Sequence, residues 1–239
     1  MSHRKLADEM IKDIQRFVEE ADALYRVTIP GKVVELRKLL QHLEQTGAFQ
    51  TRVTIHQHPQ LPRATTHQQP QLPGGHHGLE NISAENAGAE DALKTCDPNL
   101  HKVMATLKPY YTEGLLHASK IHTWLALLVP RSTDEFSVLT EARDAIHKAA
   151  EPLHVECRDG LQGIVDFYRV RAKHMSKACK YPLVEDYRVT VREHDETKLA
   201  MLHLSLQTLG ERYIVLYDAL FKNNDIVNAP LIYKTDAMY

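Results

Sequence analysis

Histidine, glutamate and cysteine are the residues of this chain that could hold a metal ion. Glu151 and His154 form a Glu-x-x-His pair, the spacing with which helical bundles bind two metal ions. Such a centre needs a second pair of this kind, which the sequence lacks, and Pro152 distorts the turn that would aim these two side chains. His154 and Cys157 lie one helical turn apart and could share a metal, but no second pair accompanies them. The sequence therefore favours a protein without a metal site or cofactor.

The motifs of nucleophilic catalysis are also missing from the sequence. It contains no G-x-S-x-G nucleophile elbow, no glycine-rich phosphate loop and no H-E-x-x-H motif. The run Glu193-His194-Asp195-Glu196 is rich in titratable groups, yet on a helix these side chains point in several directions. A solvated or intersubunit face explains this run better than a catalytic site does. We therefore expect no enzymatic activity, and a metal bound in stoichiometric amount would reopen that question.

The carboxyl end of the chain carries chemistry of a different kind. Ala237, Met238 and Tyr239 offer an α-carboxylate, a flexible apolar side chain and an aromatic ring. A carboxylate accepts charge-assisted hydrogen bonds from a lysine or from backbone amides, which is how proteins capture C-terminal peptides. Pro230 and the preceding end of a helix predict an extended segment that leaves the fold. From these residues alone, the segment is either a docking peptide or a frayed terminus.

Composition restricts the partners of the chain. Its 239 residues are 43% hydrophobic and 25% charged, with a formal net charge of −2, so long-range attraction to nucleic acid or to an anionic membrane is absent. The basic residues between 169 and 180 fall on more than one helical face and lack interleaved aromatic residues, which argues against nucleic-acid binding. The apolar run Trp124–Val129 is far shorter than the roughly 18–20 residues that a membrane helix needs.

Cysteine usage and the first residues indicate the compartment. Cys96, Cys157 and Cys179 are far apart and form no C-x-x-C pair, which suits buried thiols in a reducing environment. The N-terminus alternates charged and apolar residues and predicts a helix, not a signal peptide. We expect a soluble protein of the cytoplasm and/or the nucleus.

The elements that must position these residues begin with a helix over residues 1–45. Apolar residues recur at steps of three and four, which gives one apolar stripe. The members of its first part are Leu6, Met10, Ile14, Phe17, Val18, Ala21 and Leu24. Pro30-Gly31 interrupts the pattern before it resumes at Val33, so we expect a kink or a restart at the proline.

A different kind of segment follows over residues 46–92. It is rich in histidine, glutamine and proline, and its four prolines break any helix. No apolar face runs through it, so it cannot bury enough surface to offset the entropy lost on ordering. We predict a flexible loop between the first and second helices.

Three further helices are predicted within residues 93–239. The second helix begins at Asp97-Pro98, a good N-cap followed by a first-turn proline, and ends near Pro130. The third runs from about Phe136 to Lys180 and should bend at Pro152, and the fourth begins at Pro182 and ends at Asn223-Asn224. Trp124 shares its helical spacing with apolar neighbours and is expected in the core. The fold class is therefore all-α, a four-helix up-down bundle with one long and two short connections.

A longer motif resembles one found in a known family. The block Tyr181-Pro182-Leu183-Val184-Glu185-Asp186-Tyr187-Arg188 resembles the start of the last helix in the 11S (REG-type) proteasome activators. Weaker matches to the same family, and within it to the gamma type, are Leu107-Lys108-Pro109, Ile29-Pro30-Gly31-Lys32, Phe167-Tyr168 with Arg171-Ala172-Lys173, and Lys222-Asn223. The resemblance spans nearly the whole chain outside residues 46–92.

The resemblance implies a function that needs no enzyme. Members of this family form heptameric rings, so it implies a homo-oligomer here, whose closed ring requires a heterologous interface. It further implies that the tails, Ala237, Met238 and Tyr239, dock on the alpha ring of the 20S proteasome. The loop between the second and third helices would open the proteasome gate. Its residues are Arg131, Ser132, Thr133, Asp134, Glu135, Phe136 and Ser137.

The gate-opening loop is where the chain departs from the family pattern. That pattern reads Pro-Arg-Ile-Glu-Asp-Gly-Asn-Asn-Phe-Gly, of which only Pro130, Arg131 and Asp134 match directly, and the Gly-Asn-Asn turn is absent. Docking is thus better supported than the manner of gate opening. The competing function is an oligomeric helical adaptor or scaffold that does not act on the proteasome.

Overall fold

The computed structural model describes residues 3–50, 96–127 and 136–227 of the chain, and all regular elements in these ranges are helices. Along the chain these elements are α1 His3–Ala23, the π-helical segment η1 Leu24–Thr28, α2 Ile29–Gln45, α4 Pro98–Leu127, α5 Phe136–Lys180, α6 Glu185–Lys222 and α7 Asn224–Val227. None of the described helices is long and apolar enough to cross a membrane.

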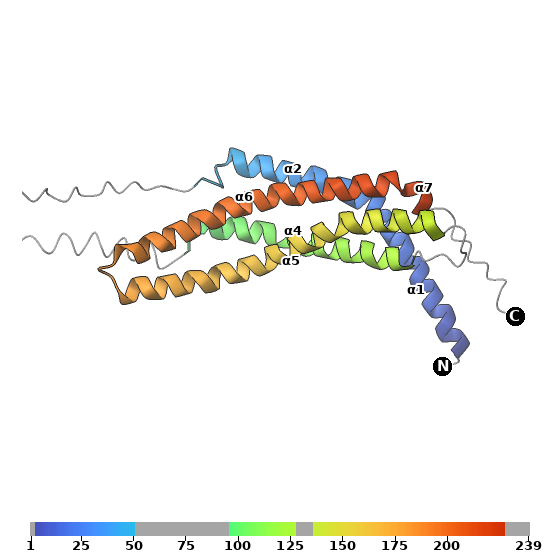
Figure 1. Ribbon diagram of the computed structural model, residues 1–239, viewed down its shortest axis with the longest axis horizontal. Helices are drawn as coiled ribbons and strands as arrows, with labels where there is room; N and C mark the ends of the chain where they lie inside the picture. The colour runs from blue at the N-terminus through green and yellow to red at the C-terminus, as the bar shows by residue number, and fades with distance from the viewer. Residues whose placement is uncertain (1–2, 51–95, 128–135, 228–239) are drawn as a thin grey trace, which may run out of the picture.

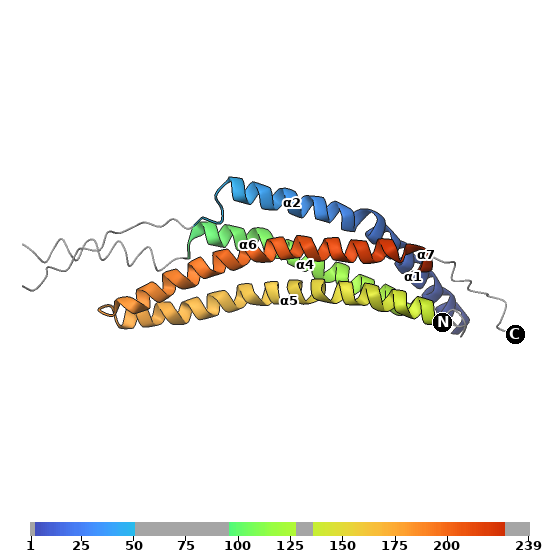
Figure 2. The same cartoon turned by 45° about the horizontal axis from the view of Figure 1, so that its top comes forward.

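Four long helices lie side by side and alternate in direction (Figures 1 and 2). These are α2, α4, α5 and α6, while α1 swings away from the bundle at one end. Their facing sides carry the apolar stripes predicted from sequence, and Trp124 is buried among them at 2% exposure. The largest side chains that are almost fully buried are Trp124, Tyr111, Tyr213, Ile29, Leu36, Leu100, Met104 and Leu107. The predicted all-α four-helix bundle is confirmed.

The bend in the first helix lies before the proline and not at it. Pro30 is accommodated near the start of α2, and the chain stays helical on both sides of it. The irregular part is η1, Leu24–Thr28, where the amide of Ile29 donates to the carbonyl of Leu24 in the i→i−5 pattern of a π-helix. A wider turn absorbs the missing amide and the ring of Pro30 without ending the helix. The chain thus restarts as a regular α-helix at Ile29-Pro30, as predicted, and the irregular turn lies just before the proline.

The end of α2 is fixed by a glycine turn. Gly47 has a φ of +66°, a left-handed conformation that favours glycine. The amide of Ala48 donates to the carbonyl of Leu43 at 2.9 Å and that of Gly47 to the carbonyl of Glu44 at 3.1 Å. These two bonds form a Schellman motif, which satisfies carbonyls that the helix end would leave unpaired. Residues 46–50 thus form an ordered turn after the end of α2 at Gln45, within the range of the predicted loop.

The start of α4 is tied to this same turn. The carboxylate of Asp97 accepts a hydrogen bond from the amide of Asn99 at 2.8 Å, as the predicted N-cap should. The side-chain amide of Asn99 donates to the carbonyl of Ala48 at 2.7 Å. The two boundaries of segment 51–95 therefore lie together at one end of the bundle. The predicted division into 1–45, 46–92 and 93–239 stays a prediction, since most of its middle segment lies outside the described residues.

Helix α5 is continuous over its whole length. Pro152 lies inside it, as Pro109 does in α4, and neither proline ends its helix. The bend predicted at Pro152 is not a sharp break, because α5 and α6 curve gradually together (Figure 2). Packing of α5 against both α4 and α6 along its length stabilises the helix despite the lost backbone hydrogen bond.

The connection between α5 and α6 is a tight turn. Tyr181–Val184 is not helical, and the amide of Val184 donates to the carbonyl of Tyr181 at 3.1 Å. Helix α6 begins at Glu185, so Pro182 lies in the turn and the fourth helix starts three residues later than predicted. The reason is topological: α5 and α6 pack antiparallel, and the chain needs this turn to reverse. Glu185 and Asp186 then occupy the first turn of α6, where carboxylates favour the helix dipole.

Candidate functional site

Three chain segments meet at one end of the bundle (Figure 1). Helix α4 ends there at Leu127, α5 begins there at Phe136, and α7 ends there at Val227. The turn between α5 and α6 and the boundaries of segment 51–95 lie at the opposite end. The two segments predicted to act on a partner, the loop after α4 and the C-terminal tail, therefore start from the same end of the molecule. We call it the loop-and-tail end.

Most of the predicted site residues lie outside the described part of the chain. This holds for Arg131, Ser132, Thr133, Asp134 and Glu135 of the loop and for the tail residues Ala237, Met238 and Tyr239. Phe136 and Ser137 are the first two residues of α5. What the structure defines is the framework from which the loop and the tail depart.

Buried side chains hold both flanks of the loop. On α4, Trp124 and Leu125 are each 2% exposed, close to the helix end at Leu127. On α5, Ala142 and Ile146 are buried within the first three turns. Rotation or translation of either helix would expose these apolar side chains. The loop is therefore attached to two rigid supports.

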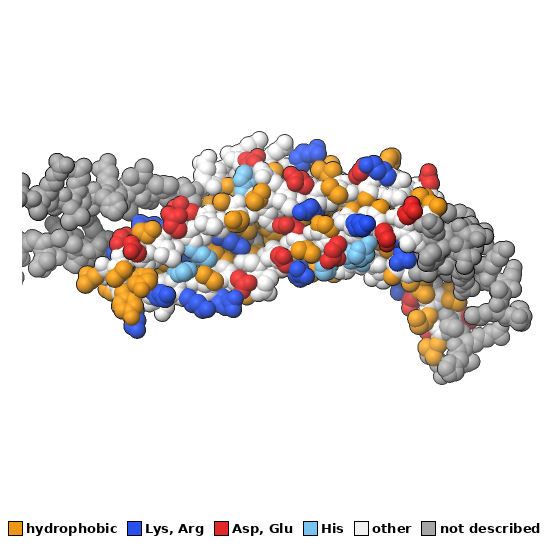
Figure 3. All heavy atoms as spheres, viewed as in Figure 1, with side chains coloured by type: hydrophobic (Ala, Val, Ile, Leu, Met, Phe, Trp, Pro, Cys, Tyr) orange, Lys and Arg blue, Asp and Glu red, His pale blue; other side chains and the backbone are white. Residues whose placement is uncertain are grey.

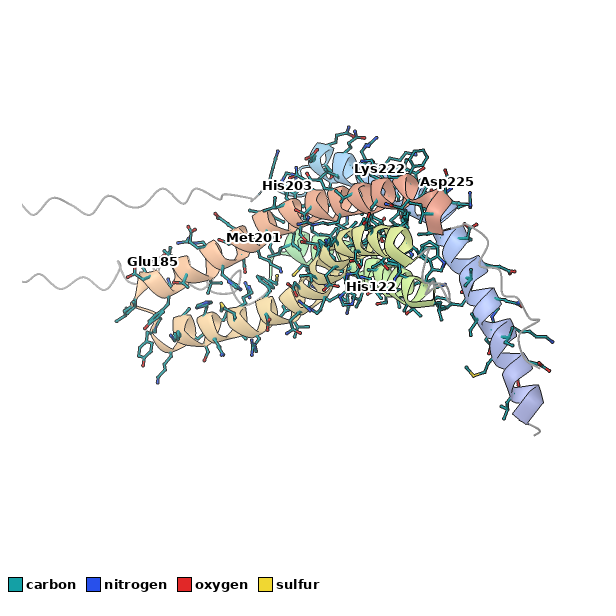
Figure 4. All side chains as sticks on the ribbon, turned by 45° about the vertical axis from the view of Figure 1, so that its right-hand side comes forward. His122, Glu185, Met201, His203, Lys222 and Asp225 are labelled. Atoms are coloured by element: carbon teal, nitrogen blue, oxygen red, sulfur yellow. The ribbon has the colours of Figure 1, made fainter. Side chains whose placement is uncertain are left out.

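The tail starts from an equally fixed point. The side-chain amide of Asn223 donates to the carbonyl of Ala219 at 2.8 Å, which caps the end of α6. The short helix α7 follows and contacts α5, and Val227 is buried at 4% exposure. Lys222 and Asp225, labelled in Figure 4, lie on either side of this change of helix. The tail cannot slide along the bundle without removing Val227 from the core.

The bent first helix also reaches this end. The ring of Tyr25 in η1 lies 6.2 Å from that of Tyr217 on α6, measured between ring centroids. Burial raises the pKa of Tyr25, so its hydroxyl stays protonated. On α1, the carboxylate of Glu20 accepts a hydrogen bond from Lys120 of α4 at 2.7 Å, and this bond lowers the pKa of Glu20. Contacts on both sides of η1 thus set the direction in which α1 leaves the bundle.

Apolar side chains remain exposed on the outer faces of the helices. Figure 3 shows them among the charged side chains of one face and gathered at the α5–α6 tip. On α6 the exposed members are Val189, Met201, Leu204, Ile214, Val215 and Phe221, and at the tip they are Tyr181, Leu183 and Val184. Leu183 is 98% exposed. Apolar surface distributed along a whole helix is typical of a face that contacts another subunit.

Sequence reasoning missed one group of side chains. His122 of α4 lies beside His147 and Glu151 of α5, and their possible ligand atoms are all within 4.8 Å of one another. The sequence analysis considered two other pairs of possible metal ligands, Glu151 with His154 and His154 with Cys157. The i, i+4 spacing of His147 and Glu151 was the signal that could have found this group. Cys157 is fully buried elsewhere, and burial raises the pKa of its thiol to about 12, which opposes the thiolate that a metal would need.

The acidic run in α6 divides between two structural contacts. Asp195 accepts hydrogen bonds from the guanidinium Nε of Arg171 at 2.9 and 3.1 Å, and His194 stacks on Phe167 at 4.9 Å. Glu193 and Glu196 are exposed. The four side chains therefore do not converge on one site.

Known proteins are similar to this chain over nearly its whole length. The family model described as "Proteasome activator PA28, C-terminal" matches residues 93–236. Curated proteins named "Proteasome activator complex subunit 3" are similar over 94% of this chain and 92% of their own length, with 27% identity in Gallus gallus and 25% in Homo sapiens. The crystal structure of the 11S subunit of the Plasmodium falciparum proteasome, PA28, matches with a TM-score of 0.65 at 21% identity over 96% of both chains, which shows the fold.

Proposed function

This chain belongs to the PA28, or 11S, family of proteasome activators, and on that premise we propose that it binds the 20S proteasome and stimulates peptide hydrolysis without an enzymatic step of its own. The observation that carries the proposal is the common origin of loop and tail at one end of the bundle. A protein that docks with one segment and acts with another on the same partner must present both on one side. We place this activity in the cytoplasm and/or the nucleus.

We propose that the active form is a heptameric ring of identical chains. The exposed apolar residues along α6, such as Met201, Leu204 and Phe221, supply a face for the neighbouring subunit. A closed ring needs a heterologous interface, in which this face meets a different face of the next chain. Exposed Val165 of α5 and Leu116 of α4 offer apolar surface on other helices for that purpose.

The tails provide the binding energy in this proposal. The α-carboxylate of Tyr239 accepts charge-assisted hydrogen bonds from the alpha ring of the proteasome, each worth about 1.5–3 kcal/mol. One tail binds weakly. Several tails on a rigid ring turn later contacts into intramolecular ones, which raises avidity on the order of a hundredfold or more. Anchoring of Val227 in the core supports this arrangement, because it fixes where every tail begins.

The loop from Arg131 to Ser137 moves the gate in this proposal. The two helices that support the loop, α4 and α5, are held in place by buried side chains. The bundle would therefore resist a force applied to the loop. Binding energy from the tails can then displace gate residues on the partner. The chain makes and breaks no covalent bond in this process.

Removal of Tyr239 tests the docking step. We expect the truncated chain to lose stimulation of peptide hydrolysis by purified 20S particles, because the α-carboxylate moves to a different position and the aromatic ring is lost. Native mass spectrometry should find the ring intact. A tag on the N-terminus is the matched control, since it adds mass without masking the tail and should leave stimulation in place.

Undiminished stimulation by the truncated chain would refute docking through the tail. The alternative function, an oligomeric helical adaptor or scaffold, predicts a different pattern. In that case purified 20S particles are not retained by the wild-type ring in a pull-down, and no variant changes peptidase activity.

A further inference from the structure

We propose that His122, His147 and Glu151 form a binding site for a divalent transition metal of the zinc class, which joins α4 to α5. Figure 4 labels His122, which lies on α4 close to α5. Two imidazoles and a carboxylate are a ligand set that zinc accepts, with a water molecule in the fourth position. The site is independent of the loop and tail and of their action on a partner.

The geometry supports three ligands from two helices. The rings of His122 and His147 stack with their centroids 4.6 Å apart, and the Nε2 atom of His122 lies 3.8 Å from a carboxylate oxygen of Glu151. His147 and Glu151 are spaced i, i+4 on α5, so both project from one face of that helix. Helix α4 contributes the remaining ligand, and a bound ion would therefore cross-link two helices.

His122 supplies an independent sign of a missing partner. Its Nε2 atom is buried and has no hydrogen-bond partner within the described structure. The 3.8 Å to Glu151 is too long for a hydrogen bond. Burial, together with His147 and His154 nearby, lowers the pKa of His122 and keeps the ring neutral, which is the form that coordinates metals. A metal ion would give this nitrogen the partner it lacks.

Only a small contraction is needed to close the site. Ligand atoms around a tetrahedral zinc are roughly 3.3 Å apart, since each bond is about 2.0–2.2 Å long. The three ligand atoms here lie within 4.8 Å of one another. His147 and Glu151 are exposed and can change rotamer without disturbing the core, so the ligands can approach without any movement of the helices.

The surrounding charges permit a cation. A cleft of about 300 Å³ lies beside the site and gives a hydrated ion access to His122 and His147. Arg143 and Asp144, which carry opposite charges, both line this cleft. Glu151 then adds negative charge at the site itself. His154, whose ring lies 5.9 Å from that of His122, adds no charge when neutral.

The position of the site gives the bound ion a mechanical effect. His122 is in the last two turns of α4, which ends at Leu127, and His147 is on the fourth turn of α5, which begins at Phe136. A metal bridge would restrain these two helices just below the segment that connects them. We therefore expect zinc to slow backbone hydrogen exchange at the end of α4 and the start of α5.

Zinc titration of the full-length ring tests the proposal. We expect one zinc ion per chain at this site, and Co²⁺ in its place should give the visible absorption of a four-coordinate ion. Each of His122→Gln, His147→Gln and Glu151→Gln should weaken zinc binding at least tenfold, because the protein would then fill only two of the four coordination positions of the ion. Circular dichroism and native mass spectrometry verify that each variant still folds and assembles.

Two controls separate this site from other histidines. His42→Gln removes an exposed histidine from α2 and should leave zinc binding unchanged. A second variant replaces the five histidines of segment 51–95 with glutamine, and it should retain the site. The replaced residues are His56, His58, His67, His76 and His77.

Three outcomes would overturn the proposal. The first is a wild-type ring that binds no zinc. The second is binding that disappears in the variant lacking the segment 51–95 histidines, which would assign the metal to that segment. The third is equal affinity in the wild type and in His122→Gln and His147→Gln. Each outcome is read from binding alone, so it does not depend on stimulation of the proteasome.

Discussion

Gly114 shows how closely α4 and α5 approach at a single residue. A Cβ atom placed on Gly114 would lie 2.4 Å from the Sγ atom of Cys157, which is fully buried on α5. Gly160 on α5 allows the same close approach from the other helix, because a Cβ atom placed on it would lie 2.7 Å from the ring of Tyr111 on α4. A glycine on each helix therefore makes room for a side chain of the other.

We predict that Gly114→Ala lowers the free energy of unfolding by about 1–3 kcal/mol, the usual cost of overpacking a core. Chemical denaturation measures this change. Gly31→Ala is the matched control, since a Cβ there meets nothing within 4 Å, and it should be neutral or stabilise by up to about 1 kcal/mol. Adding Cys157→Ala to Gly114→Ala should recover part of the loss because it removes the clashing sulfur. Additive losses in the double variant would contradict this explanation.

The contact between His117 and Tyr213 is sensitive to pH. The Nδ1 atom of His117 and the hydroxyl of Tyr213 are 2.8 Å apart. Burial raises the pKa of Tyr213, so its hydroxyl keeps its proton and can donate to His117. Burial also lowers the pKa of His117 from its ordinary value of 6.5. Both groups are therefore neutral in the folded chain at neutral pH.

The sign of the pH dependence follows from the lowered pKa of His117. As the pH falls through about 6.5, the unfolded chain takes up a proton on this residue and the folded chain does not. The free energy of unfolding therefore decreases below that pH. We predict a flatter profile for His117→Gln between pH 7.5 and pH 5.5, measured by denaturation at each pH. His42→Gln is the control, and a His117→Gln profile parallel to that of the wild type would contradict the prediction.

At the scale of elements, an ion pair joins the two helices of the α5–α6 hairpin. The hairpin tip extends beyond the start of α4 (Figure 2). Ala178 and Val191 are buried there but do not belong to the main core. The Arg171 and Asp195 side chains are 8% and 17% exposed and bond across the two helices. A charged contact thus links the hairpin where apolar packing is thin.

We predict that Asp195→Asn destabilises the hairpin by on the order of 3 kcal/mol, because the Nε of the buried Arg171 no longer donates to a charged carboxylate. Hydrogen exchange along residues 170–195 should speed up more than exchange in α4. Asp218→Asn is the matched control, since it breaks an exposed pair with Lys222 and should change stability by less than about 1 kcal/mol. Equal effects of the two substitutions would show that burial of the Arg171 pair is unimportant.

At the scale of the whole molecule, the proposed function depends on two segments whose supports share one end of the bundle. In this proposal the tail supplies binding, and the loop from Arg131 to Ser137 supplies the action on the gate. Because these segments leave the bundle from separate supports, α7 on one side and α4 with α5 on the other, their effects should be separable.

We predict that substitutions in the loop lower stimulation of peptide hydrolysis more than they lower binding to 20S particles. Replacing Asp134 and Glu135 with alanine is the first choice, since one of these residues would stand near the family's Asn once Phe136 is placed opposite the family's Phe. Stimulation at saturating activator gives the gating effect, and affinity is measured separately by a binding titration. The tail truncation at Tyr239 is the contrasting variant, because it should reduce affinity first. Equal loss of both quantities in the loop variant would argue against a separate gating role.

The sequence alone determined the type and approximate bounds of the long helices of the bundle, because a helix repeats its apolar residues at a spacing visible within the chain. The same spacing placed Trp124 in the core, and the block at 181–188 pointed to the family. The family resemblance also named the loop and tail residues, most of which lie outside the described structure, and their roles remain predictions.

Tertiary structure alone decided how the helices meet. The contact of Gly114 with Cys157 and the meeting of His122 with His147 depend on the relative position of α4 and α5, which is the sum of many apolar contacts. The position of the π-helical turn at Leu24–Thr28, just before Pro30, and the start of α6 at Glu185, after Pro182, were also seen only in the folded chain. Local spacing fixes which side chains share a face of one helix, whereas only the packed bundle fixes which face of another helix lies opposite.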